Sequence, residues 1–512
     1  MKANRTKKFL CLFACLIFVR AYALSEISVE AYGAAQVVSG SCFLLKTDYE
    51  NFIIDCGMFI GSESEQDKNY QVDTKLLSAK ALFLTHAHLD HCAKIPLLIH
   101  KGFKGKIYST DATKILALSL FKNRNGFDLI DREWFWSKRR KENGIANKKS
   151  VAIHWTQSCR DTIKSIEYAS GLLKDIKKKK RVDFILCKKC CKQSSAEIEK
   201  FFETIEYDKE TKISADFSVK AINAGHIPGS TSFIFTSSGK KILFSGDLSS
   251  GYSRLTGKFE IPQKADLIFM EATYGARGKI SFEQYNIFRK DLLDAVDANK
   301  IVWIPALSFN RTQKVLYELK LLQDEGALSK EIPIYSVSPS ANIITKIYDN
   351  QIKDKKDGWF LKEVYEKGAI IPENVKFRDI KKKALKAPLI LISSNGDMSL
   401  GKSAQLATEI LSLQNVFVMI VNYVAPESPA GLLLENKQPF KNFYSLAKIK
   451  KYDVFSDHAD FASLEKWLSK QDENSKIFII HSTVQSATFV TEKLKSKGFK
   501  KTSTAKTGII MK

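Results

Sequence analysis

Short apolar runs that end in polar residues recur in the first half of the chain and predict a sheet-rich fold. A two-residue period over 27–31 is typical of a half-buried strand. Apolar runs at 41–46 and 51–55 flank the turn-forming residues 47–50 and predict a hairpin. Runs of the same kind predict further strands at 81–84, 106–109, 221–226, 232–236, 240–245 and 265–270.

Beyond residue 282 the pattern changes to alternating helices and strands. Helical periodicity predicts helices over 282–296, 313–322 and 403–413, and apolar runs between them predict strands over 301–304, 332–335, 389–392 and 416–421. Such alternation is typical of a mostly parallel sheet, so we expect a second α/β domain. A helix over 461–470 and a strand over 477–480 follow. If the histidines beside them complete a site begun earlier, the second domain is inserted into the first.

Residues 122–219 are charged and show little periodicity, apart from a helical pattern around 196–205. We interpret them as an insertion over the site. The full length of 512 residues exceeds what one hydrophobic core serves, and the hydrophobic fraction of 44% excludes a disordered chain. The formal net charge of +24 suits a polyanionic partner such as nucleic acid, and a merely lysine-rich surface is the alternative. Basic runs lie at 138–141, 177–181 and 381–383.

The first 23 residues have the three parts of a secretory signal: basic residues ending at Lys8, an apolar stretch over 9–19, and Ala21-Tyr22-Ala23. We therefore expect a cleaved signal peptide and export to a periplasmic or secreted location. A buried strand or an uncleaved anchor, and a cytoplasmic protein, are the alternatives. No other run approaches the length of a membrane span, so none is expected in the mature chain.

The cysteines outside this leader fall into two groups. Cys42, Cys56 and Cys92 lie in or beside apolar segments and are expected to pack as small hydrophobic residues. The second group is the C-x-x-C-C cluster of Cys187, Cys190 and Cys191, with Cys159 as a further neighbour. A structural zinc site and a disulfide are equally compatible with these residues.

Three of the eight histidines lie within six residues, directly after the predicted strand 81–84. Ligand sites form at the carboxyl ends of strands in open α/β sheets. On an extended backbone His86 and His88 can point the same way, and the following turn can direct Asp90 and His91 toward a second metal ion. Imidazole nitrogens and a carboxylate oxygen suit Zn²⁺. The alternative, a polar turn with histidines there by chance, is weakened by this clustering.

Other polar residues also end predicted strands. Asp55, in Asp55-Cys56-Gly57, could orient a metal-bound histidine through a hydrogen bond, although alone it would more often be a turn residue. His226, Glu271 and His481 each follow an apolar run. A site built along one edge of a sheet would bring such residues together.

In combination these residues resemble a known family. His86-x-His88-x-Asp90-His91, with His226 and Asp247 downstream, is similar to the metallo-β-lactamase hydrolase superfamily. Glu271 within 269–275, His458 within 455–461, and His481 look like the three additional motifs of its β-CASP branch, which includes the pre-mRNA 3′-end cleavage endonuclease and its bacterial relatives.

The resemblance implies an α/β fold, a metallo-β-lactamase αββα sandwich with an inserted α/β β-CASP domain. The first part of the sandwich would cover 24–275, with 122–219 insertion-like, the β-CASP domain 276–449, and the return of the sandwich 450–512. Expected activities are zinc-dependent cleavage of single-stranded RNA, or hydrolysis of DNA or a smaller ester. A non-catalytic nucleic-acid-binding protein that has kept this scaffold is the third alternative. Such a protein would lack one of the metal ligands, and none of them is missing from this sequence. A homodimer is an open alternative to a monomer.

The resemblance also implies roles for the residues. One zinc ion would be bound by His86, His88 and His226, and a second by Asp90, His91 and His481. Asp247 would bridge the two ions, and a hydroxide formed from water between them would attack phosphorus. His458, polarised by Glu271, would give a proton to the leaving oxygen, and Asp55 would orient a ligand.

The chain departs from the family pattern outside these ligands. Ser482 replaces a glycine, Thr483 and Val484 stand where an acidic residue is usual, and Asn310 replaces the glycine before Arg311. The loop 393–401 is longer by one residue and has one glycine fewer. These changes concern substrate-facing loops.

Overall fold

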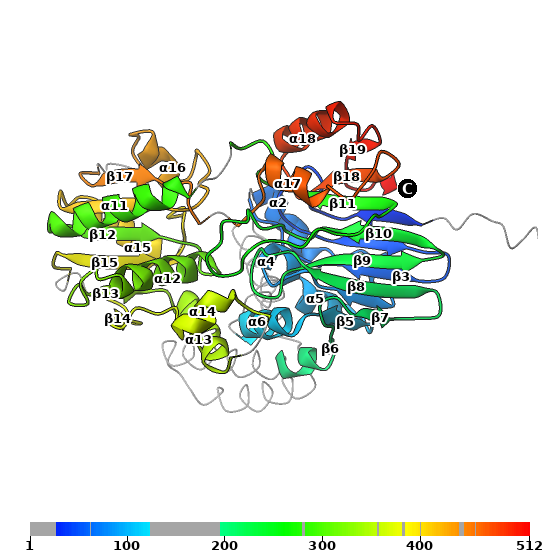
Figure 1. The fold of residues 1–512 in the computed structure, drawn as a ribbon, viewed down its shortest axis with the longest axis horizontal. Coiled ribbons are helices and arrows are strands. Elements are labelled where there is room, and N and C mark those ends of the chain that lie inside the picture. Colours follow the sequence, from blue (N-terminus) through cyan, green and yellow to red (C-terminus); the bar gives the residue numbers. More distant parts are fainter. Residues whose placement is uncertain are drawn as a thin grey trace, which may run out of the picture.

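The computed structural model describes residues 27–61, 63–122, 195–278, 282–355, 358–380, 385–399, 401–439, 445–455 and 457–512. They form two lobes, one containing two sheets stacked face to face and the other a single sheet covered by helices (Figure 1). The predicted α/β class is confirmed. The leader, the three basic runs and the second cysteine group lie outside these residues, whereas Cys42, Cys56 and Cys92 are buried and free, as predicted. No described helix has the length and apolar character needed to span a membrane.

The first sheet of the double-sheet lobe has seven strands in the order β20-β1-β2-β3-β4-β5-β6. The chain enters through an antiparallel hairpin, and β3 to β6 are then parallel. The strands are β1 (Ser28–Ala31), β2 (Phe43–Lys46), β3 (Asn51–Ile54), β4 (Ala81–Phe83), β5 (Lys106–Ser109), β6 (Phe202–Thr204) and β20 (Ile510–Met511). The helices of this part are α2 (Glu63–Gln66), η1 (Asp67–Tyr70), α3 (Thr74–Leu77), α4 (Leu89–Cys92), α5 (Ile95–His100) and α6 (Asp111–Lys122).

The second sheet has the order β19-β18-β11-β10-β9-β8-β7. Phenylalanines fill the space between the two sheets, with Phe52 stacked on Phe217 at a centroid distance of 3.7 Å and Phe83 edge-on to Phe235 at 4.9 Å. The strands are β7 (Glu210–Lys212), β8 (Phe217–Asn223), β9 (Thr231–Ser237), β10 (Lys240–Phe244), β11 (Leu267–Glu271), β18 (Lys476–Ile480) and β19 (Thr502–Thr504). Helices α17 (Phe461–Trp467) and α18 (Val484–Ser496) pack on its outer face.

Two strand predictions were wrong in detail. The strand at 27–31 was expected to be half-buried, but all four residues of β1 are buried. Its Glu30 is accommodated because Lys46 and Lys75 bind the carboxylate, at 2.5 and 3.2 Å. The insertion was expected to extend to residue 219, but that boundary lies too far along the chain. Strands β6, β7 and the start of β8 lie within 195–219 and pair with the two main sheets. Strands β6 and β7 are short edge strands with few apolar residues, so the period of two is weak there.

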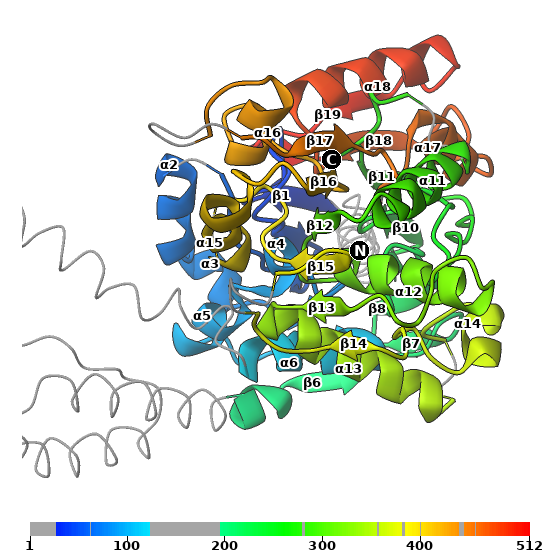
Figure 2. The same cartoon turned by 90° about the vertical axis from the view of Figure 1, so that its left-hand side faces the viewer.

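The other lobe contains a six-stranded sheet in the order β14-β13-β15-β12-β16-β17, and every pair in it is parallel, as predicted (Figure 2). Its central strands are buried on both faces. Val302 and Ile304 face one apolar core, and Ile301 and Trp303 face the other. This two-sided burial explains the continuous apolar runs of the sequence. The strands are β12 (Ile301–Pro305), β13 (Ile334–Ser336), β14 (Val375–Lys376), β15 (Leu389–Ser393), β16 (Val416–Ile420) and β17 (Lys448–Lys451).

The helices of this lobe are α11 (Glu283–Asp297), α12 (Arg311–Asp324), α13 (Pro339–Lys353), α14 (Lys362–Lys367), α15 (Gly401–Ile410) and α16 (Pro429–Leu434). The lobe is inserted between neighbouring strands of the second sheet. Strand β18 pairs in parallel with β11, and Glu271 lies opposite Ile480. This register brings His481, far away in the chain, beside the segment that follows β11.

Candidate active site

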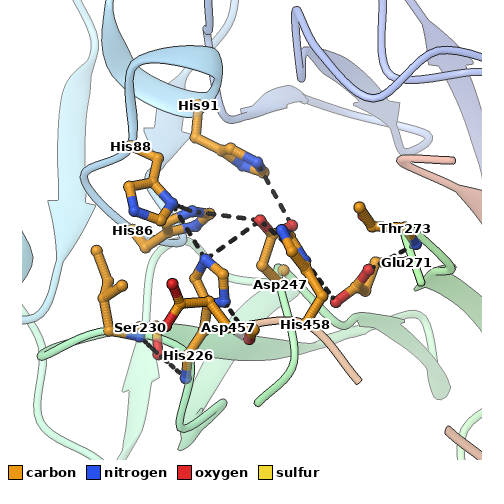
Figure 3. Close-up of polar contacts among 12 residues, drawn as sticks. His86, His88, His91, His226, Ser230, Asp247, Glu271, Thr273, Asp457 and His458 are labelled. Carbon is orange, nitrogen blue, oxygen red and sulfur yellow. Dashed lines mark hydrogen bonds and ion pairs between the residues drawn. The ribbon is translucent and has the colours of Figure 1, made fainter. Parts of the chain in front are cut away.

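The ligand atoms of the predicted metal-binding residues fall into overlapping clusters, and Figure 3 shows most of these residues with Glu271 and His458 around Asp247. Strands β3, β4, β8, β11 and β18 each end at or just before one of the predicted site residues, and Asp247 follows β10. His458 comes from the segment before α17. The chain thus places carboxylates and imidazoles at one edge of both sheets, as the sequence predicted.

Three imidazoles form the first half of the site. His88 Nδ1 lies 3.1 Å from His86 Nε2 and 3.1 Å from His226 Nε2. His226 Nδ1 donates to the backbone oxygen of Asp457 at 2.7 Å, which leaves its Nε2 lone pair directed at the other rings. Burial lowers the pKa of all three, that of His88 to about 4. Neutral imidazoles with converging nitrogens are the form that binds a metal ion.

Asp90, His91 and His481 form the second half. His481 Nε2 lies 3.1 Å from His91 Nε2 and 3.4 Å from Asp90 Oδ2. Burial lowers the pKa of His91, but the carboxylates of Asp247 and Asp55 outweigh burial and raise it to about 10. This half therefore favours a positive charge, and a metal ion bound there would replace the proton on His91.

Asp247 lies between the two halves. Its Oδ2 is 3.5 Å from Nε2 of both His86 and His226, while its Oδ1 is 3.4 Å from His91 Nε2 and 3.5 Å from His481 Nδ1. Among the described residues, buried Oδ1 has no hydrogen-bond partner. An orphaned carboxylate oxygen facing imidazole nitrogens fits a metal ion well, because a cation would satisfy all of these atoms.

Asp55 orients His91. Its Oδ2 accepts a hydrogen bond from His91 Nδ1 at 2.7 Å, so that Nε2 points into the site. Thr85 fixes the same carboxylate, since its backbone N–H donates to Oδ1 at 2.8 Å. Asp55 is therefore bonded as expected of a residue that orients a ligand.

Half-buried His458 and buried Glu271 form a pair beside Asp247. His458 Nδ1 is 3.1 Å from Glu271 Oε1, and the backbone N–H groups of Leu248 and Thr273 hold the Glu271 carboxylate at 2.9 Å each. Burial lowers the pKa of His458, but Glu271 and then Asp247 outweigh it and raise the pKa to about 9. The imidazole is thus protonated at neutral pH and can act as an acid.

Sequence reasoning missed the buried network around Asp457, which connects the two lobes. Asp457 Oδ1 accepts a hydrogen bond from Asn310 Nδ2 at 2.7 Å and binds the Lys314 ammonium, while Oδ2 lies 3.3 Å from Arg311 Nη2. Since its backbone oxygen holds His226, this network supports the first half of the site. Asn310 has a φ of 61°, which favours the glycine expected there, and its side chain adds a hydrogen-bond donor.

Thr273 was also missed. Its hydroxyl lies 2.9 Å from both the backbone oxygen and Nδ1 of His481. The contact depends on the pairing of β11 with β18, which sequence spacing does not reveal. The only signal was the position of Thr273 two residues after Glu271.

Replacing Asp457 with Ala is expected to destabilise the protein by about 3–5 kcal/mol, because Lys314 and Arg311 would remain as buried cations without their carboxylate. The double variant Asp457→Ala/Lys314→Met, which removes one of these cations, should lose less. Chemical denaturation followed by tryptophan fluorescence measures both. An unfolding midpoint of Asp457→Ala equal to that of the wild type would contradict this account.

Comparisons with known proteins agree with this arrangement. Residues 35–154 match the metallo-β-lactamase superfamily, 312–433 the Beta-Casp domain, and 446–504 the Zn-dependent metallo-hydrolase RNA specificity domain. A solved structure of a protein of unknown function from Enterococcus faecalis has a similar fold, with a TM-score of 0.50 at 10% identity, over 95% of this chain and 99% of that one.

Two curated relatives match along nearly their whole length. Ribonuclease TTHA0252 of Thermus thermophilus is 24% identical over 88% of this chain and 92% of its own. The RNase J-like protein of Methanocaldococcus jannaschii is 26% identical over 89% and 92%. With the three matched regions, these relatives show that the chain belongs to the metallo-β-lactamase superfamily, in the branch that carries a β-CASP domain.

Proposed function

We propose that the protein is a two-zinc phosphodiesterase that cleaves single-stranded RNA. The observation that carries the proposal is the position of Asp247, whose two carboxylate oxygens face two separate sets of ligands. His86, His88 and His226 would bind one ion, and Asp90, His91 and His481 the other. When bound, such a pair of ions supplies Lewis-acid charge on both sides of the phosphodiester and makes water nucleophilic at neutral pH.

The remaining residues would position ligands and move a proton. His458, protonated and held by Glu271, would donate its proton to the oxygen that leaves phosphorus. Glu271 keeps the imidazole oriented because two backbone N–H groups fix its own carboxylate. Asp55 and Asp457 would maintain the tautomers of His91 and His226 in which Nε2 faces the metal ions.

The choice of RNA is supported by three findings besides the site. Both relatives described above carry ribonuclease names, and residues 446–504 match a domain described by RNA specificity. A net charge of +24 favours a polyanionic substrate. The substrate panel below separates single-stranded RNA from duplex RNA and DNA.

Metal analysis and product mapping on one preparation would test the proposal. We expect about two zinc ions per chain, cleavage of single-stranded RNA, and loss of both after dialysis against a chelator, with recovery on adding zinc. Duplex RNA, single-stranded DNA and a nitrophenyl phosphodiester complete the substrate panel. Cleavage of DNA or the ester without cleavage of RNA would overturn the choice of substrate, and activity unaffected by metal removal would overturn the mechanism.

A further inference from the structure

A row of three side chains leads outward from His458. The ring of Tyr274 lies edge-on to the His458 ring, at a centroid distance of 5.2 Å. The Arg277 guanidinium lies over the Tyr274 ring, 3.6 Å from its centroid, and 5.1 Å from the centroid of Tyr423. Tyr274 and Arg277 follow β11 in the double-sheet lobe, whereas Tyr423 follows β16 in the inserted lobe. The row therefore joins the two lobes beside the candidate acid.

The outer end of this row is an exposed aromatic ring on a fixed backbone. Tyr423 is 58% exposed, and Leu307, on a neighbouring loop, is 48% exposed. Buried Asn422 ties the two loops together, since its Oδ1 accepts a hydrogen bond from the Leu307 N–H at 3.1 Å and its Nδ2 donates to Pro305 at 2.7 Å. A large ring held in water at the outer end of a row that begins at His458 is available to a flat ligand.

The positive charge of Arg277 is also available to bind a ligand. Within the described part of the chain no carboxylate lies within ion-pairing distance of its guanidinium, whose face is occupied by Tyr274. A guanidinium that rests on an aromatic ring keeps its N–H groups free at the edge, where they can bind a phosphate. Base stacking on an aromatic ring combined with phosphate binding by arginine is the usual chemistry of single-strand recognition.

We propose that Tyr423 and Arg277 form a subsite for the nucleotide on the leaving-group side of the cleaved bond. The Tyr423 ring, flanked by Leu307, stacks the nucleobase, and Arg277 binds the adjacent phosphate. The subsite lies on the leaving-group side because the row begins at His458, the proposed proton donor, so this assignment rests on the proposed function. A base paired in a duplex cannot reach the ring, so the subsite selects single strands with little base preference.

Binding measurements test the subsite separately from catalysis. With the zinc-loaded protein and a cleavage-resistant phosphorothioate oligoribonucleotide, Tyr423→Ala should weaken affinity about 5- to 150-fold, and Tyr423→Phe should recover most of the loss. Tyr49→Ala is the matched control, because Tyr49 is 76% exposed in the turn between β2 and β3, at the other end of β3 from Asp55. Equal affinity of Tyr423→Ala and wild type would overturn the proposal.

The salt dependence of binding separates the two residues. Arg277→Gln should reduce the slope of log affinity against log salt by about 0.7, the value for one lost phosphate contact on a single strand. Tyr423→Ala should leave the slope as in the wild type, because stacking releases no counterion. An unchanged slope in Arg277→Gln would remove the phosphate contact from the proposal.

A substrate lacking one base locates the subsite. On RNA with an abasic residue on the leaving-group side of the cleaved bond, Tyr423→Ala should cleave as fast as the wild type, although it is slower on intact RNA. An equal loss on both substrates would overturn the proposal while leaving the ribonuclease function intact. Conversely, a wild type that cleaves no RNA but binds it through Tyr423 would overturn the proposed function and support the stacking site.

Discussion

Replacing Asp247 with Ala is expected to abolish RNA cleavage and to lower the zinc content, while the protein stays folded. Asp247 contacts both halves of the site, so its loss removes one ligand from each proposed ion. A metal ion supplies several kcal/mol of transition-state stabilisation, and each loss of about 1.4 kcal/mol slows the reaction tenfold. The rate should therefore fall about 10³-fold or more. His88→Ala should have a similar effect, because it removes the nitrogen between His86 and His226.

The measurements are kcat/KM on single-stranded RNA, zinc by elemental analysis, and thermal unfolding of the same samples. Asp247→Asn keeps the volume of the side chain, and it replaces Asp247→Ala in these measurements if the Ala variant folds poorly. Asp216→Ala is the control for loss of a carboxylate, because Asp216 is exposed in the turn between β7 and β8. Wild-type activity in Asp247→Ala or His88→Ala would end the two-metal interpretation.

The candidate metal-binding histidines could be recognised because they lie in local patterns, whereas Asp247 was recognised only through the resemblance to the metallo-β-lactamase superfamily. His86, His88 and His91 lie within six residues after an apolar strand, and His226 and His481 each follow an apolar run. Parallel strands buried on both faces likewise have continuous apolar sequences, so the inserted sheet was recognisable. Local spacing and apolar runs thus contained enough information for the fold class and for the position of these residues.

The supporting contacts could not be predicted, because they depend on tertiary packing. Lys314 lies on α12 among helical residues, and nothing in its neighbourhood of the sequence distinguishes a solvated lysine from one buried against Asp457. The edge strand β7 has only three residues, all of them polar, so its register follows from pairing with β8. The approach of Arg277 to Tyr423 depends on how the two lobes pack.

Asn310 shows how a departure from the family pattern can be compatible with the site. Asn310 has a φ of 61° and a ψ of −45°, a combination that lies outside the left-handed helical region and that glycine adopts more readily than asparagine. Its side chain donates to Asp457, so the substitution adds a hydrogen bond between the lobes. The altered position therefore contributes to holding the candidate ligand His226.

The second large effect is expected from His458→Ala, which should retain zinc and slow RNA cleavage about 10²- to 10⁴-fold. His458 is not among the proposed ligands of either ion, so its loss removes the proton donor alone. The effect should depend on the leaving group. A nitrophenolate leaves phosphorus without protonation, so the variant should hydrolyse a nitrophenyl phosphodiester almost as fast as the wild type.

The pH dependence gives an independent test of the same residue. Because the pKa of His458 is raised to about 9, the acid form is present at neutral pH and is lost as the pH rises through about 9. Wild-type turnover of RNA should therefore fall above this pH, and the fall should be absent in His458→Ala. Glu271→Gln removes the charge that raises the pKa, so the fall should move to lower pH. Normal RNA turnover in His458→Ala, or equal losses on RNA and the nitrophenyl ester, would show that His458 does not donate the proton.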